Sequence, residues 1–259
     1  MNRASFTTRL GVLGGMGPQA TADFYLKLVS ATDAATDQDH VATIISSVPQ
    51  IPDRSAAIAG NGLSPLPALS EGIRELVSVG AGAIAIPCNT AHFWHGELAA
   101  ISPVPVFHIV DAAAVRLNTL ERDGPVGVLA TRGTIAANIY QRRLETQGAF
   151  QIMIPTENDQ ETLVSPGIAA VKAGDLNLGA DLLAQAAQRL RARGAGSAIM
   201  ACTEIPLVLG TDSNVGMTLI DATEALARHC VEWWREIRGE ANAIQPSNLH
   251  LAGTTERKS

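Results

Sequence analysis

Cysteine, close cysteine pairs and long apolar runs are all scarce in this sequence. Only three of the 259 residues are cysteine, and no C-x-x-C pair occurs, so neither a disulfide framework nor a cysteine-based zinc site is expected. No apolar run approaches the roughly 20 residues that span a bilayer, and residues 1–10 lack the apolar core of a signal peptide. We therefore expect a cytoplasmic protein with reduced thiols and no membrane partner.

Positive charge is also in short supply. The chain has 19 lysines and arginines against 25 aspartates and glutamates, a formal net charge of -6, and no long basic run. This balance argues against a nucleic-acid partner. With 46% hydrophobic residues, the chain can form one large or two modest globular domains with their own cores.

What the sequence does contain is an internal repeat. The segment GAGAIAIPCNT (residues 80–90) aligns with GAGSAIMACTE (residues 194–204) at a constant offset of 114 residues. In this alignment Cys88 corresponds to Cys202. Each cysteine follows an apolar, strand-like run and precedes a polar step that could start a helix. We expect both thiols at the carboxyl ends of buried strands, where open α/β sheets bind ligands, and next to helix starts that favour thiolate. The third cysteine, Cys230, lies in an apolar helical segment and is interpreted as structural.

Strand-like and helix-like segments alternate along the chain, which predicts parallel sheets built from βα units. The fold class expected is α/β, with two pseudo-symmetric lobes and a cleft between them. We assign residues 1–116 and 222–239 to the first lobe, 117–221 to the second and 240–259 to a flexible tail. Further strands are expected at 9–13, 41–48, 106–109, 125–130 and 151–154; helices at 20–30, 66–79, from 111, 135–147, 176–193 and 221–238; and a functional loop at 49–67.

Three local patterns leave alternatives open. Residues 15–20 fit the dinucleotide fingerprint G-x-G-x-x-G/A, but the next strand ends without the acid that would bind a ribose, which favours a backbone-amide nest for a carboxylate. His92, four residues after Cys88, could form a Cys–His nucleophile pair, tune the thiol or be solvated. Arg54 and Lys172 are either surface charges or anion ligands.

Four segments, GVLGGMGPQAT, PQIPDR, IPCNTAHFW and ACTEIPLVL, resemble in their order and spacing the aspartate racemase branch of the aspartate/glutamate/hydantoin racemase superfamily. The similarity covers about residues 9–235. It implies racemisation of an acidic amino acid without pyridoxal phosphate or another cofactor, in a cleft between two lobes, commonly in homodimers.

The resemblance also assigns roles to residues. It implies that Cys88 and Cys202 are the catalytic acid/base pair. Glu204 fits the aspartate branch, since glutamate racemases typically have histidine there, whereas Ala201 departs from the glycine that the family often has. The substrate-binding residues implied are Met16, Gln50, Arg54, Asn89, Thr90, Thr131, Lys172, Thr203 and Glu204.

Two thiols suit racemisation because the α-proton leaves one face of the carbon and a proton returns to the other. Two hypotheses compete with this one. The first is a hydrolase or isomerase with Cys88 as nucleophile beside His92, and the second is an amino-acid binding protein without catalysis.

Overall fold

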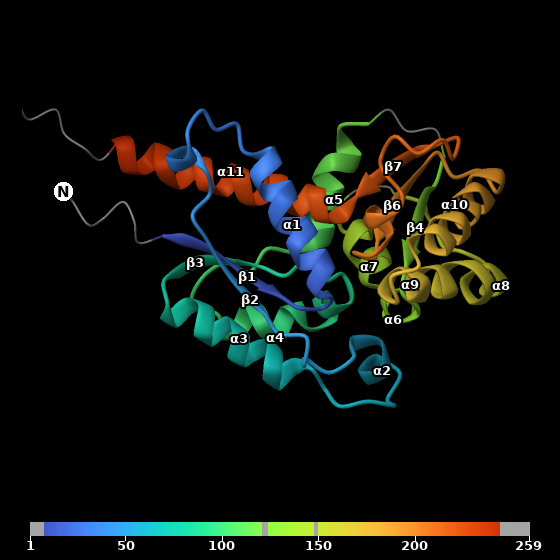
Figure 1. Cartoon of the computed structure of the whole chain (residues 1–259), viewed down its shortest axis with the longest axis horizontal. Helices are drawn as coiled ribbons and strands as arrows, with labels where there is room; N and C mark the ends of the chain where they lie inside the picture. The colour runs from blue at the N-terminus through green and yellow to red at the C-terminus, as the bar shows by residue number, and fades with distance from the viewer. Residues whose placement is uncertain (1–7, 121–123, 148–149, 244–259) are drawn as a thin grey trace, which may run out of the picture.

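The computed structural model describes residues 8–120, 124–147 and 150–243 and contains two parallel sheets (Figure 1). The first sheet has the strand order β2-β1-β3. Its strands are β1 (Arg9–Gly14), β2 (Thr43–Ser47) and β3 (Ala81–Ala85). In the register of the sheet, Gly11 of β1 pairs with Ile44 of β2 and Ile84 of β3. The central strand β1 is buried from its second residue onward, as its apolar sequence predicts.

The second sheet has the strand order β5-β4-β6-β7. Its strands are β4 (Val126–Ala130), β5 (Ile152–Met153), β6 (Ser197–Ala201) and β7 (Thr218–Asp221). Every residue of β4 and β6 is buried, as is usual for central parallel strands covered on both faces. The expected α/β fold with two sheets is therefore confirmed, and we call each sheet with its helices a lobe.

Helices cover both faces of the first sheet. Figure 1 shows α1 and α11 above this sheet and α3 and α4 below it. Helix α3 packs Leu69, Ile73 and Leu76 inward from one face, as the helical spacing of its apolar residues predicts. Helix α11 packs against α1 and α5 and also reaches β6 and β7. The bounds are α1 (Pro18–Ala31), α3 (Leu66–Ser78), α4 (His95–Ile101), α5 (Ile109–Asn118) and α11 (Ala222–Ala243).

The helices of the second lobe surround the second sheet. The longest, α10, buries Leu183 and Leu190 and contacts β4 and β6. The bounds in this lobe are α6 (Arg132–Ala136), α7 (Ile139–Glu145), α8 (Glu157–Asp159), the π-helix η4 (Gln160–Val164), α9 (Ser165–Lys172) and α10 (Leu176–Ala192). Short elements complete the chain: η2 (Asp37–Asp39), α2 (Arg54–Ile58), and the 3₁₀ helices η3 (Thr90–Trp94) and η5 (Ile205–Leu207).

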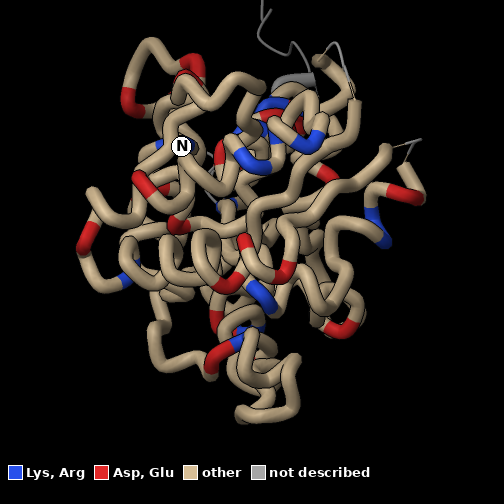
Figure 2. The backbone as a smooth tube through the Cα atoms, turned by 90° about the vertical axis from the view of Figure 1, so that its right-hand side faces the viewer, with Lys and Arg blue, Asp and Glu red and all other residues tan. Residues whose placement is uncertain are grey.

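One buried apolar cluster spans both lobes, and each lobe also has a cluster of its own. Residues of β1 such as Val12 and residues of β4 and β6 such as Val128 and Ile199 belong to the same buried cluster. An ion pair also joins the lobes, because Lys27 of α1 contacts the buried carboxylate of Asp221 at 2.6 Å. Figure 2 shows acidic and basic positions interspersed over one side of the molecule. Within the described residues, no helix combines the length and the apolar character required to cross a membrane.

Two expected elements differ in the structure. The strand expected at 106–109 is reduced to a single bridge between Val106 and Ile84, because the His108 ring accepts the Val110 N–H at 3.2 Å and starts α5 at Ile109. The helix expected at 135–147 is two helices, α6 and α7, because Asn138 adopts a left-handed conformation with φ 52°.

Other elements had no counterpart among the sequence-based expectations. Helix α2 lies inside the loop expected at 49–67, where the Asp53 carboxylate caps it by accepting the Ala56 N–H. Strand β7 and the helices between Glu157 and Lys172 were also not expected. Helix α11 extends to Ala243, past the start of the expected tail, whose remaining residues lie outside the described part of the chain. The lobe boundaries proposed from the sequence remain a prediction.

Candidate active site

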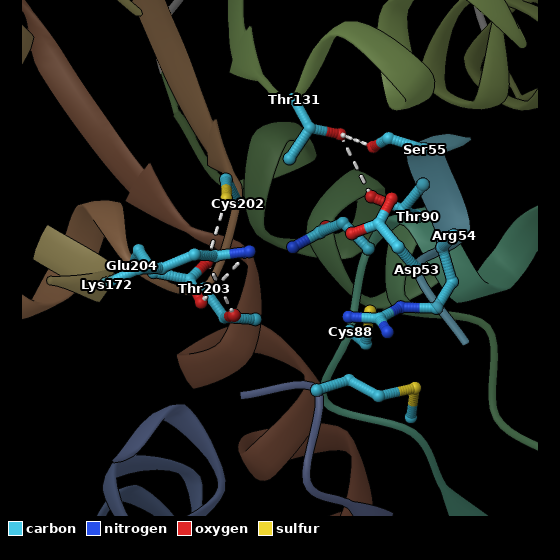
Figure 3. A pocket seen from close by; sticks show the side chains of 12 residues that line it. Asp53, Arg54, Ser55, Cys88, Thr90, Thr131, Lys172, Cys202, Thr203 and Glu204 are labelled. Atoms are coloured by element: carbon cyan, nitrogen blue, oxygen red, sulfur yellow. Dashed lines mark hydrogen bonds and ion pairs between the residues drawn. The ribbon is translucent and has the colours of Figure 1, made fainter. Parts of the chain in front are cut away.

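A pocket lies where the carboxyl ends of strands from both sheets meet (Figure 3). The segments that follow four strands contribute residues to its wall: Met16 after β1, Cys88 after β3, Thr131 after β4 and Cys202 after β6. The cavity volume is about 20 Å³, which is room for about one water molecule. Its lining is Met16, Asp53, Arg54, Ser55, Cys88, Asn89, Thr90, Thr131, Lys172, Cys202, Thr203 and Glu204.

Cys88 and Cys202 enter this pocket from different sheets. Cys202 directly follows β6, whereas Cys88 stands three residues beyond the end of β3. Both side chains are buried and both thiols are free. Figure 3 shows Cys202 with Thr203, Glu204 and Lys172 on one side of the pocket, and Cys88 with Arg54 on the other. The structure thus brings the repeated cysteines together at one site.

The surroundings of Cys202 differ from the sequence-based expectation. We expected a helix start to favour its thiolate, but only the three-residue η5 follows. Instead, the Cys202 thiol donates a hydrogen bond to Oε2 of Glu204 at 3.0 Å. Burial first, and then the negative charge of Glu204, raise the pKa of Cys202 well above that of an ordinary thiol. Cys202 is therefore held as a protonated thiol beside a carboxylate.

His92 is neither solvated nor bonded to a thiol. Its Nδ1 lies 2.9 Å from the backbone oxygen of Cys88, and its Nε2 accepts the Ile109 N–H at 3.1 Å. Burial lowers the pKa of His92 to about 4, so the ring is neutral and its Nδ1–H donates to the Cys88 carbonyl. Since backbone groups occupy both ring nitrogens, the structure does not form the Cys–His pair of the competing hypothesis. His92 holds the backbone of Cys88 in place.

Three threonine hydroxyls, which we call the threonine cluster, bond to one another where the lobes meet. Thr90 of the first lobe lies 3.0 Å from Thr131 and 2.9 Å from Thr134, which are themselves 3.0 Å apart in the second lobe. Ser55 of α2 lies 3.5 Å from Thr131. Sequence reasoning found Thr90 and Thr131 but missed Thr134 and Ser55, although the spacing T-x-x-T in residues 131–134 is a signal for two hydroxyls at one helix start.

The two basic residues of the pocket are unlike each other. Lys172, at the end of α9, lies 3.9 Å from Oε1 of Glu204. Arg54, at the start of α2, donates from one nitrogen to the carbonyls of Ile51 and Pro52, while its Nε is buried without a hydrogen-bond partner in the described part of the chain. Within the described residues, no carboxylate lies within salt-bridge distance of Arg54. Its positive charge is available to a ligand.

The remaining predicted substrate-binding residues lie either in the wall of the pocket or outside it. Met16, Asn89 and Thr203 line the pocket as expected, whereas Gln50 is exposed and outside it. Asp53 lines the pocket and had not been anticipated.

The Gly15 N–H, expected to form part of an anion nest, is already bonded to the Thr21 hydroxyl at 2.8 Å. Gly15 has φ +91°, and a Cβ there would meet the Val48 backbone at 2.3 Å, so this glycine serves a tight turn. Within the described residues, no group of three or more His, Cys, Asp or Glu side chains could hold a metal ion.

Comparison with known proteins places this arrangement in a family. The family model described as Asp/Glu/Hydantoin racemase matches residues 13–230. A broad specificity amino-acid racemase, RacX, of Bacillus subtilis (strain 168) is 29% identical over 226 residues, covering 86% of this chain and 96% of its own. The structure of an aspartate racemase from Picrophilus torridus superimposes with a TM-score of 0.78 at 32% identity, covering 87% of this chain and 94% of that one. A glutamate racemase from Francisella tularensis, at 16% identity and a TM-score of 0.62 over 94% of this chain and 85% of that one, shares the fold. Since the family model matches most of the chain, and the pocket lies at the carboxyl edges of its duplicated sheets, this protein belongs to the Asp/Glu/hydantoin racemase family.

Proposed function

We propose that this protein is a cofactor-independent amino-acid racemase that interconverts the L and D forms of aspartate, or of aspartate and glutamate. The observation that carries the proposal is the shared pocket of Cys88 and Cys202, which come from different sheets and stand at corresponding points of a duplicated sequence. A pair of proton-transferring groups on opposite faces of one carbon is what inversion of that carbon requires.

The proton transfers follow from the two thiols. For one enantiomer, the Cys88 thiolate removes the α-proton and becomes a thiol, while the Cys202 thiol gives its proton to the opposite face and becomes a thiolate. For the other enantiomer the roles reverse. After turnover of the first enantiomer Cys88 carries the proton and Cys202 does not, so the starting state returns when Cys88 releases a proton to water and Cys202 takes one up. Glu204, which accepts the Cys202 S–H, is placed to relay the proton to Cys202. The proton is conserved throughout, and no electron acceptor is needed.

The α-carboxylate has a matching site in the threonine cluster. Among the described residues the three hydroxyls bond to one another, to Ser55 and to the Thr134 N–H, so those of Thr90 and Thr131, which line the pocket, can turn their protons toward an incoming anion. Removal of the α-proton adds negative charge to the carboxylate oxygens. Donors that are already fixed in a closed pocket stabilise this charge more than that of the substrate, which is how they lower the barrier.

Preference for an acidic substrate is supported by Arg54 and Lys172. Among the residues that the structure describes, the Arg54 charge has no carboxylate partner, and Lys172 is 3.9 Å from Glu204, too far for a strong pair. A second carboxylate on the substrate would supply the missing negative charge. A neutral side chain would leave the Arg54 charge unpaired in the pocket.

The assembly and location that we propose are a homodimer in the cytoplasm. The three free thiols support a reducing compartment. Exposed apolar side chains on α1 and β2, Tyr25, Leu26 and Ile45, support a contact between two copies beside the edge of the first sheet.

Proton NMR in heavy water tests the proposed function. L-Aspartate, L-glutamate and L-alanine are incubated separately with the protein, without added cofactor, and the α-proton signal and the enantiomer ratio are followed. We expect exchange of the α-proton together with inversion, fastest for an acidic substrate. An α-proton that persists for every amino acid would contradict the proposal in favour of a binding protein, and a covalent adduct trapped on Cys88 alone would favour the hydrolase hypothesis.

A further inference from the structure

Tyr140 of α7 is a fully buried tyrosine whose hydroxyl reaches the pocket wall without lining the pocket. The hydroxyl donates to Oδ1 of Asn89 at 2.6 Å, across the junction of the two lobes. Asn89 immediately follows Cys88, and its side chain is also buried. The Asn89 Nδ2 has no hydrogen-bond partner within the described part of the chain. A buried amide with a satisfied oxygen and an unsatisfied nitrogen needs an acceptor from elsewhere.

We infer that Tyr140 is a positioning residue that fixes the Asn89 amide with its NH₂ toward the substrate, so that Asn89 donates to the substrate carboxylate. The inference rests on the proposed function, because the carboxylate is that of the amino-acid substrate. The Asn89 oxygen already accepts the Tyr140 hydrogen bond, whereas the N–H donors of the same amide have no partner among the described residues, which favours a carboxylate rather than an ammonium as the group that Asn89 binds.

Because Tyr140 stays protonated, it favours one of the two possible orientations of the Asn89 side-chain amide. Burial first, and then the negative charge of Asp221, raise the pKa of Tyr140, so its hydroxyl keeps its proton and donates it. If the amide were reversed, the NH₂ would face the hydroxyl oxygen. The Tyr140 proton would then have no acceptor among the described residues.

The chemical effect is expected on the rate of proton removal more than on binding. When the α-proton leaves, negative charge moves onto the carboxylate oxygens, so a fixed N–H donor gains strength between substrate and transition state. Tyr140→Phe removes only the hydroxyl and frees the amide to rotate. We expect a fall in kcat of about tenfold with little change in KM, equivalent to one hydrogen bond.

The experiment measures kcat and KM for aspartate in the full-length protein and in five variants. Thr146→Val is the control, because it removes an exposed hydroxyl at the opposite end of α7 that donates to the Arg143 carbonyl, and it should behave as the unmutated protein. Tyr140→Phe should lower kcat in the unmutated background and have no further effect in Asn89→Ala. A purely structural role would lower the melting temperature and give additive kinetics, which would overturn the inference.

Asn89→Asp provides a second arm that does not depend on the folding of Tyr140→Phe. The aspartate still accepts the Tyr140 hydrogen bond but cannot donate, so we expect it to be as impaired as Asn89→Ala. Activity close to that of the unmutated protein would show an acceptor role for this position and overturn the inference. Absence of α-proton exchange by the unmutated protein would overturn the proposed function and this inference together, whereas a normal kcat in Tyr140→Phe overturns the inference alone.

Discussion

The Cys202 thiol and the Glu204 carboxylate form a buried hydrogen bond of 3.0 Å inside the pocket. Since the Glu204 charge raises the pKa of Cys202, Glu204→Gln should lower it, and thiolate should form at lower pH. The measurement is the pH dependence of iodoacetamide alkylation at Cys202 in a Cys88→Ser background. We expect the alkylation curve to move to lower pH in this background, and racemisation to slow when Glu204→Gln is made in the protein that retains Cys88. Glu161→Gln, at an exposed position of η4, is the control, and an alkylation curve that does not move would contradict the coupling.

Loss of either pocket cysteine should stop racemisation in both directions. Cys88→Ala and Cys202→Ala each remove one of the two proton-transferring groups, and we expect rates lower by about a hundredfold to ten-thousandfold. The assay is polarimetry with each enantiomer of aspartate. Cys230→Ala is the control: this cysteine is fully buried in α11, so its loss should cost about 1 kcal/mol of stability and leave kcat unchanged. Normal turnover by Cys202→Ala would eliminate the two-base mechanism.

Arg54→Ala and Lys172→Ala should impair acidic substrates selectively. The loss of a charge-assisted contact to the side-chain carboxylate should lower kcat/KM for aspartate by about tenfold to a hundredfold, with a smaller effect on alanine. The ratio of the two kcat/KM values is the quantity to compare. Arg74→Ala, at an exposed residue of α3 that pairs with Glu71, serves as the control. An unchanged preference for aspartate in Arg54→Ala would refute this account of specificity.

Gly133→Ala should hold the pocket open. A Cβ at Gly133 of α6 would meet Ser55 of α2 at its Oγ, Cα and Cβ at 2.6, 2.8 and 2.9 Å, so α2 must move away from α6. The cavity of about 20 Å³ is too small for an amino acid, and we therefore expect α2 to open for entry and close again for catalysis.

Displacement of α2 would misplace Arg54 and Ser55, and kcat/KM for aspartate should fall by as much as a hundredfold. Gly96→Ala in α4 is the matched control, since nothing lies within 4 Å of the added Cβ, and it should be neutral or slightly stabilising. Equal kinetics in the two alanine variants would show that closure of α2 against α6 is not required.

His92 should make the protein less stable in mild acid. Its pKa is lowered from 6.5 to about 4 in the folded state, so between these values the unfolded chain binds a proton that the folded chain does not. His92 should therefore lower the free energy of unfolding by roughly 3 kcal/mol as the pH falls through this window. His108, whose pKa is also lowered by burial, adds to the fall in the same direction. Urea denaturation at several pH values measures it. His92→Asn should be less stable at pH 7 but show a smaller slope, whereas His229→Asn, at a partly exposed position of α11, should keep the slope of the unmutated protein.

The sequence predicts the parts of this protein that depend on local pattern. The repeat around Cys88 and Cys202 and the alternation of apolar and amphipathic runs are enough for two α/β lobes and a shared site. The break between α6 and α7 was not predictable in this way, because a single left-handed residue, Asn138, interrupts an otherwise helical pattern.

Contacts between distant side chains were beyond the same reasoning. Thr134 and Tyr140 matter because α6 and α7 bring them against Thr90 and Asn89 of the other lobe, and no spacing along the chain encodes that contact. The state of Cys202 was wrongly expected for a similar reason. The local pattern suggested a helix start, whereas the thiol responds to its burial and to Glu204.

The duplication aligns the Asn89-Thr90 pair of one half with the Thr203-Glu204 pair of the other, so the two walls of the pocket are chemically unlike although their strands correspond. Mirror-image amino acids have equal free energies in water, and their interconversion has an equilibrium constant of unity. A racemase must therefore show the same kcat/KM for both enantiomers, whatever the asymmetry of its walls. Cys202 is paired with a carboxylate and Cys88 is not, but this difference can appear only as changes in kcat and KM that compensate each other. The enantiomer with the lower kcat must also have the lower KM.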